Sequence, residues 1–339
     1  MTTKEKLTTG AARAREELEQ KGRLMLRAPL LLGGAECAIR FLLGAVLSGA
    51  QIFGSYAPFA VALVGASGSG LGGFSALLGA VLGYLVFWGP LEGLRYIAAA
   101  ILAFSVSFAL FDIRLYRKGW FMPVVTALLT GATGFVYLSE SGWRTADVIF
   151  FLTEVFFTGI TVYFYRLSFA RWREEPEGSD LRRLVSLLIL GGTVLLALAQ
   201  VALPGGLSLG RAAAALGVML LAYRNGFGLG SAVGISAGLA MDLAAGGGPY
   251  YSMVYAVAGL VTGIFQAQGK LLAAIAYVLT NAVAVLWTWE SGVRISLLYE
   301  VFLASVCFLL LPEAVFRWAG TLFLREERTE TVSRASAYV

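Results

Sequence analysis

The chain has 339 residues, of which 58% are hydrophobic and 14% are charged, whereas an ordinary soluble domain is roughly 25% charged. With a mean hydropathy of +0.77, this composition excludes a soluble enzyme, a disordered chain and a collagen-like chain. The net charge is +5 and the sequence contains no histidine, which excludes Ser-His-Asp and Cys-His catalysis. The sequence therefore predicts an all-α polytopic membrane protein.

Basic residues gather in four places along the chain. These are the N-terminal tail (residues 1–28), the loop from Arg114 to Lys118, a charged linker (residues 168–183) and the C-terminal tail (residues 319–339). Lys and Arg near the ends of spans mark the cytoplasmic side of a membrane protein. We therefore expect a multi-pass protein of the cell membrane with all four clusters, and so both termini, in the cytoplasm.

Apolar segments lie on either side of the linker, six before it and six after it. The first six cover residues 30–53, 56–67, 71–88, 94–111, 121–138 and 148–165, and the second six cover residues 184–203, 212–223, 227–244, 250–265, 271–289 and 297–318. A straight span needs about 20 residues, and the second segment of each group is much shorter, so it either crosses or re-enters. We expect twelve crossings, with ten as the alternative, because four complete crossings return the Arg114–Lys118 loop to the side of the N-terminus.

The two groups of segments share a pattern. Three glycines of the third segment match three of the ninth at a constant spacing, and Glu154-Val155-Phe156 recurs as Glu300-Val301-Phe302. Small residues let membrane helices pack closely. We expect two repeated halves of six helices each, residues 29–167 and 184–318, packed through these glycines. The matched glycines are Gly73, Gly79 and Gly83 in the first half and Gly228, Gly234 and Gly238 in the second.

Ionisable residues inside apolar segments are the candidates for function, because each costs some 2.5–3.5 kcal/mol to insert. Glu36 and Arg40 stand four residues apart, a spacing that pairs them on one helix face, either as a structural pair or as part of a pathway. Glu154 and Glu300 either form a carboxylate pair in a central cavity, which would bind a cation or carry protons, or each accept hydrogen bonds from a neighbouring helix.

Asp242 follows the glycine-rich helix of the second half, and we expect a helix-end cap or a partner for Arg224. Arg211 and Arg224 bracket the short segment 212–223, and we expect their side chains to reach lipid headgroups. Only four aspartates occur, scattered among different loops and helices, and no phosphate-binding glycine loop is present. The sequence therefore predicts no catalytic residue, cofactor, metal site or nucleic-acid partner. The expected partners are the lipid bilayer and a second copy of the chain.

The ordered motifs of the chain resemble those of the N-terminal membrane domain of the stage II sporulation protein E family. The resemblance runs from Leu30 to Arg325. Its main parts are the APF turn at Ala57–Phe59, the stretch GSAVGISAGLAMDLA, the stretch GLVTGIFQAQGK ending at Lys270, and the last helix LLYEVFLASVCFLLLPEAVFR with Glu300 and Pro312.

In that family the membrane part precedes a cytosolic regulatory segment and a metal-dependent serine/threonine phosphatase, which would need manganese or magnesium. The resemblance implies an anchor that acts at the polar septum during sporulation, meets division-septum proteins and serves activation of the forespore sigma factor. The sequence stops at Val339, so we expect residues 319–339 to begin a linker to a domain outside this chain. The predicted function is a non-catalytic anchor, localisation and oligomerisation module. The alternative is a transporter or ligand receptor that uses the duplicated carboxylates.

Overall fold

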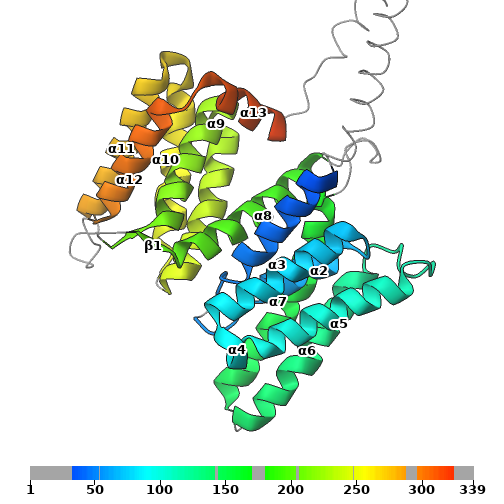
Figure 1. Ribbon diagram of the computed structural model, residues 1–339. Coiled ribbons are helices and arrows are strands. Elements are labelled where there is room, and N and C mark those ends of the chain that lie inside the picture. Colours follow the sequence, from blue (N-terminus) through cyan, green and yellow to red (C-terminus); the bar gives the residue numbers. More distant parts are fainter. Residues whose placement is uncertain are drawn as a thin grey trace, which may run out of the picture.

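The computed structural model describes residues 33–52, 54–141, 144–169, 180–203, 206–246, 248–287 and 296–323. Within these ranges the chain is helical except for one two-stranded hairpin and one isolated bridge (Figure 1). The predicted N-terminal tail, most of the charged linker and most of the C-terminal tail lie outside the described residues. The all-α prediction is confirmed for the described part of the chain.

The first half begins with a helix over residues 33–47. An irregular stretch, residues 48–58 and here named the first connection, follows it and contains a bridge between Ile52 and Tyr56. The helices after it are α2 (Phe59–Ser67), α3 (Leu71–Phe87), the single turn α4 (Gly89–Glu92), α5 (Leu94–Leu110), α6 (Phe121–Ser141) and α7 (Thr145–Phe169).

The second half begins with α8 (Asp180–Ala199). The second connection, residues 200–208, contains the antiparallel strands β1 (Ala202–Leu203) and β2 (Leu207–Ser208), with Ala202 opposite Ser208. The elements after it are α9 (Leu209–Ala245), α10 (Tyr250–Ile264), the 3-10 turn η1 (Phe265–Gln268), α11 (Lys270–Trp287), α12 (Ser296–Leu310) and α13 (Glu313–Phe323).

Helix α9 is two helices joined at Gly226. This glycine has φ +84° and ψ −176°, a conformation that residues with a side chain rarely adopt. A Cβ atom on Gly230 would lie 2.7 Å from the Cβ of Ala222, so the chain folds back at this point. Residues 209–225 and 227–245 therefore pack on one another, and Gly68, with φ +80°, ends α2 in a similar way.

Five of the described helices are long and apolar enough to cross a membrane. They are α6, α7, α8, α11 and α9, the last counted over all 37 residues on both sides of Gly226, and α3, α5 and α12 are shorter apolar helices. Large hydrophobic side chains lie exposed along these helices, among them Phe156, Val283 and Phe302. Apolar surface of this extent is typical of helices surrounded by lipid, so the described chain has several candidate membrane spans, while the number of crossings and the orientation stay predictions.

The short second segment of the first half takes the form of α2, which has nine residues. At 1.5 Å per residue this helix is about 14 Å long, half of the roughly 30 Å hydrocarbon thickness. Its residues Phe59 to Gly65 are buried, and it packs against α3, α5, α6 and α7. Helix α2 is thus an enclosed half-helix that cannot cross the bilayer by itself. In the second half, residues 209–225 are about twice as long.

The matched glycines have different neighbours in the two halves. Cβ atoms on Gly79 and Gly83 would lie 2.0 Å from Phe41 O and 2.4 Å from Ala45 O, both in the helix over residues 33–47. A Cβ atom on Gly73 would instead lie 1.9 Å from Gly68 O. In the second half Gly234 and Gly238 pack against α10, where added Cβ atoms would lie 2.2 Å from Tyr255 O and 2.3 Å from Ser252 Cα, and Gly228 faces open space. Gly79, Gly83, Gly234 and Gly238 thus lie where another helix comes close, whereas Gly73 faces the turn before its own helix and a Cβ atom on Gly228 would have nothing within 4 Å.

Candidate functional site

The buried charges of the described chain gather beside the two connections. A glutamate, an arginine and a tyrosine meet at each one. We name these groups the Glu154 cluster (Arg95, Tyr96 and Glu154) and the Glu300 cluster (Arg211, Tyr251 and Glu300). Both carboxylates are almost fully enclosed, with exposed fractions of 2% for Glu154 and 1% for Glu300.

Glu300 of α12 pairs with Arg211 through two hydrogen bonds. Arg211 Nε donates to Glu300 Oε2 at 2.6 Å, and Nη2 donates to Oε1 at 2.7 Å. The backbone N–H of Ser208 also donates to Oε1, at 2.6 Å, and Arg211 interacts electrostatically with Tyr251. Such a bidentate pair with a further donor satisfies both oxygens of a buried carboxylate.

The local sequence explains this arrangement. Ser208 is the N-cap of α9, and its Oγ accepts a hydrogen bond from the N–H of Arg211 at 3.4 Å. Arg211 therefore stands in the first turn of the helix, where its side chain reaches across to α12. The carboxylate of Glu300 lies at the N-terminus of α9, the end of a helix that attracts negative charge. The pair thus fixes the second connection to α12.

Glu154 of α7 has a different environment. The hydroxyl of Tyr96 accepts hydrogen bonds from the N–H of Ala57, at 3.0 Å, and from Nη2 of Arg95. The Tyr96 hydroxyl also interacts electrostatically with Glu154. Among the described residues Oε1 of Glu154 has no hydrogen-bond partner, and no ion pair joins this carboxylate to Arg95.

The first connection is held by aromatic side chains from α3 and α5. The Tyr84 hydroxyl donates to Ala57 O at 2.6 Å, and Trp88 Nε1 donates to Ser48 O at 2.9 Å. The rings of Tyr84 and Tyr96 stack with centroids 5.0 Å apart. Irregular backbone at membrane depth is stable only when protein groups satisfy it, and these bonds supply that need.

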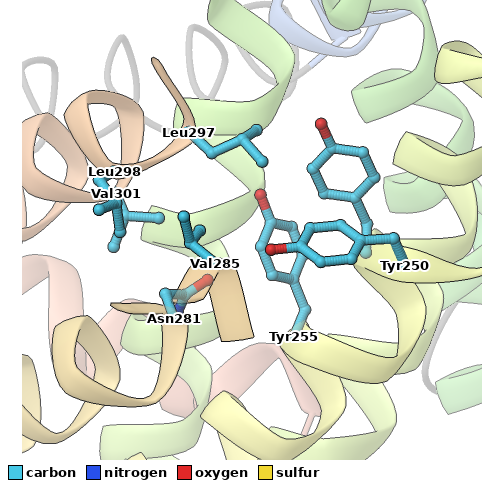
Figure 2. Close-up of a pocket in the computed structure, with 8 residues that line it drawn as sticks. Tyr250, Tyr255, Asn281, Val285, Leu297, Leu298 and Val301 are labelled. Atoms are coloured by element: carbon cyan, nitrogen blue, oxygen red, sulfur yellow. The ribbon is translucent and has the colours of Figure 1, made fainter. Parts of the chain in front are cut away.

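A small cavity lies next to the Glu300 cluster. Figure 2 shows Tyr250 and Tyr255 on one side of it and Asn281, Val285 and Leu297 on the other. Its volume is about 10 Å³, room for about one water molecule. No small-molecule substrate fits a space of this size.

Comparison with known proteins identifies the family of this fold. The family model described as "SpoIIE, N-terminal domain" matches residues 2–319. The chain belongs to the SpoIIE N-terminal domain family. It is also 26% identical over 248 residues to Stage II sporulation protein E of Bacillus subtilis (strain 168), across 72% of this chain and 30% of that relative. No solved structure matches. The predicted family is confirmed, and the match is to the N-terminal domain with no phosphatase domain matched.

In this SpoIIE N-terminal domain Glu154 and Glu300 do not form a carboxylate pair, and Glu300 instead accepts hydrogen bonds from neighbouring elements, the other alternative that the sequence left open. Glu154 contacts groups of α5, and Glu300 contacts groups of α9, so the two belong to separate clusters. The expectation for Arg211 was also wrong, because its side chain turns inward to Glu300 rather than outward to headgroups. The sequence around an arginine in the first turn of a capped helix is the same whether its side chain turns inward to a carboxylate or outward to lipid headgroups.

The other predicted site residues have local partners. Arg40 Nη2 lies 2.5 Å from Glu36 Oε1, and Arg40 Nη1 donates to Ser67 O at 2.8 Å, so this pair also ends α2. Asp242 accepts hydrogen bonds from the N–H groups of Tyr251, at 2.7 Å, and Ser252, at 2.9 Å. It therefore caps the start of α10.

Arg95 and Tyr96 were not among the predicted site residues. They stand in the first turn of α5, after Gly93 and Leu94, and neither residue type is unusual at the end of an apolar segment. A usable signal was the buried carboxylate itself, since an acidic residue at membrane depth requires a donor nearby.

Proposed function

We propose that this chain is the non-catalytic membrane anchor of a sporulation phosphatase, and that it localises and assembles that enzyme at the polar septum, where the enzyme serves activation of the forespore sigma factor. The observation that carries the proposal is the family match over residues 2–319 to a chain whose described helices are long, apolar and exposed to lipid. The chain spans about a third of the length of its curated relative. The phosphatase activity, its metal and its septal partners are therefore part of the proposal.

Self-association belongs to this proposal, but the matched glycines do not provide its surface. Gly79 and Gly83 are covered by the helix over residues 33–47, and Gly234 and Gly238 are covered by α10. Two apolar grooves remain on the lipid-facing surface, one between α6 and α7 and one between α10 and α11, with volumes of about 520 and 530 Å³. Contacts between copies would use such exposed apolar surface.

Localisation in sporulating cells tests the anchor. The chain is fused at its C-terminus to a fluorescent protein and imaged as the polar septum forms. We expect fluorescence to concentrate at the septum. Gly228→Leu, at an open position, should keep this pattern, while Gly79→Leu should lose it because the added side chain meets Phe41 O. Even fluorescence around the whole membrane would contradict the proposal.

An internal duplication is the simplest origin for the two halves. In each half a first helix, an irregular connection and a glycine turn precede the remaining helices. In each half a glutamate on the last long helix meets an arginine and a tyrosine beside that connection. The arginine comes from α5 in one half and from α9 in the other, so the duplicated parts have diverged.

Transport or ligand reception is the second candidate function. One observation favours it, the unpartnered oxygen of Glu154. The paired state of Glu300 and the small volume of the nearby cavity give it no support. Replacing both carboxylates with glutamine distinguishes the candidates. A transporter or receptor would lose its response to the transported species or ligand, whereas an anchor that still folds would keep its septal position.

A further inference from the structure

The two clusters contain the same three residue types and differ in how the carboxylate is satisfied. Glu300 uses both oxygens, with three hydrogen bonds of 2.6 to 2.7 Å. Glu154 leaves Oε1 unpartnered, although 98% of its surface is enclosed. It also lies nine residues into α7, about 14 Å from the start of that helix. An ionised carboxylate there would be buried with only part of its charge compensated.

The nearest cation is held away from Glu154. The Arg95 guanidinium donates to the Tyr96 hydroxyl and, at 3.1 Å, to Ser55 O. It also lies over the ring of Tyr56, with its carbon 5.2 Å from the centroid. No ion pair between Arg95 and Glu154 exists within the described ranges. The Tyr96 hydroxyl therefore stands between the two charges.

Within the described residues, the titratable and charged groups that act on this cluster come from several elements, among them Tyr165 of α7, which acts on Tyr84. Helix α5 supplies Arg95 and Tyr96, α3 supplies Tyr84, and the first connection supplies Tyr56. Helix α6 supplies Tyr137, over which Arg95 lies, and α7 supplies Asp147, which acts on Tyr56. Arg95 is the one cation among these neighbours.

We propose that Glu154 is a reversible proton-binding site whose counter-ion, Arg95, is kept apart by Tyr96 while the proton is bound. In the protonated state one oxygen of Glu154 accepts from Tyr96 and the carboxyl group is neutral, so its burial costs far less than that of a charge. When the proton leaves, the carboxylate attracts the Arg95 guanidinium directly, as Glu300 holds Arg211.

The movement of Arg95 toward Glu154 changes hydrogen bonds of the backbone. Arg95 can approach Glu154 only by leaving Ser55 O, and Tyr96 must then release the N–H of Ala57. Both groups belong to the first connection, which leads into the enclosed half-helix α2. The proton-binding site thus controls how tightly that connection is held. It is a property of the Glu154 cluster alone and does not depend on septal localisation.

Infrared spectroscopy tests the site on the full chain in lipid vesicles. Difference spectra are recorded between about pH 5 and pH 9, a range in which a surface carboxylate stays ionised. We expect the carbonyl band of a protonated carboxylic acid at the acidic end and its loss at the alkaline end. Glu154→Gln should remove this band, and Glu36→Gln, at an exposed carboxylate, should retain it. A Glu154→Gln spectrum identical to that of the unmodified chain overturns the proposal.

Two further measurements test the proposal even if Glu154→Gln fails to fold. Dicyclohexylcarbodiimide enters membranes and reacts with protonated carboxyl groups, and mass spectrometry should find several-fold more adduct on the unmodified Glu154 at acidic than at alkaline pH, with Glu300 unlabelled. Arg95→Gln should keep the infrared band at alkaline pH, because the counter-ion is gone. The proposal is also overturned if Arg95→Gln loses the band at the same alkaline pH as the unmodified chain, or if Glu154 and Glu300 are labelled equally.

Discussion

At the residue scale, replacement by glutamine should destabilise the fold far more at Glu300, which is paired, than at Glu154, which has an unpartnered oxygen. Glu300→Gln leaves the Arg211 guanidinium without its anion, and breaking a buried pair in this way costs roughly 3–5 kcal/mol. Glu154→Gln resembles a protonated glutamate and should cost less than about 1 kcal/mol, since it keeps an acceptor for Tyr96. Unfolding of both variants by denaturant in detergent micelles measures the difference.

The matched control for that comparison is Arg211→Lys, which keeps the positive charge and loses the second hydrogen bond. Its cost should lie between those of the two glutamine variants, because lysine makes only a point contact with the carboxylate. A Glu154→Gln variant that is as unstable as Glu300→Gln would show that Glu154 is ionised and tightly paired in the folded chain.

Asp242 gives a second prediction at this scale. Its two carboxylate oxygens accept from two backbone N–H groups at the start of α10. Asp242→Ala leaves both donors unpartnered, and loss of a helix cap costs roughly 0.5–2 kcal/mol. Asp112→Ala, at an exposed loop position, should have no effect in the same unfolding assay. If Asp242→Ala and Asp112→Ala are equally stable, Asp242 does not stabilise the start of α10.

At the scale of elements, close approach of helices depends on particular glycines. Gly79→Ala places a Cβ 2.0 Å from the carbonyl oxygen of Phe41, a backbone atom that cannot turn away. The helix over residues 33–47 must then move off α3, and such overpacking costs roughly 1–3 kcal/mol. Gly228→Ala faces open space and should be neutral or slightly stabilising. Thermal unfolding in detergent compares the two, and a destabilised Gly228→Ala with an unaffected Gly79→Ala would refute the packing assigned here.

The same glycines show what the sequence could and could not predict. Apolar runs located the helices well, because lipid-facing and buried positions are both apolar and only the ends change composition. Glycine spacing did not identify the neighbour, since Gly79 and Gly234 share a pattern and pack on different helices. The partner of Glu154 lies 58 residues earlier in the chain, at Tyr96, and no local pattern reports such a contact. Arg211 was misassigned for the same reason.

At the scale of the whole molecule, the two halves share one continuous core. Tyr165 of α7 and Thr193 of α8 form a hydrogen bond of 2.7 Å, and both side chains are buried. The apolar core includes residues of both halves, from Leu47 to Phe316. The described part of the junction between α7 and α8 is therefore packed through buried side chains.

One end of the bundle holds the loop after α5, in which Arg114, Arg117 and Lys118 are exposed. A Cβ atom on Gly68 would lie 3.6 Å from the Tyr116 hydroxyl of the loop after α5, and Arg166 lies over the Tyr116 ring. In the second half Lys270 pairs with Glu313 at 3.0 Å, and Gln266 lies beside Gly226. The opposite end holds both connections and α4. Positive loops stay in the cytoplasm, so the Tyr116 and Lys270 end is expected to face it.

Cysteine labelling of whole cells checks this orientation. Cys37 and Cys307 are first replaced by alanine, and single cysteines are then placed at Arg117, in the loop after α5, or at Glu92, in α4, both exposed positions. A membrane-impermeant maleimide should label Glu92→Cys in intact cells, and Arg117→Cys only after the membrane is permeabilised. The reverse pattern would invert the whole bundle and place both buried clusters near the cytoplasmic face. With the expected pattern, the Glu154 cluster lies toward the outer face, so a proton reaching it comes from outside the cytoplasm.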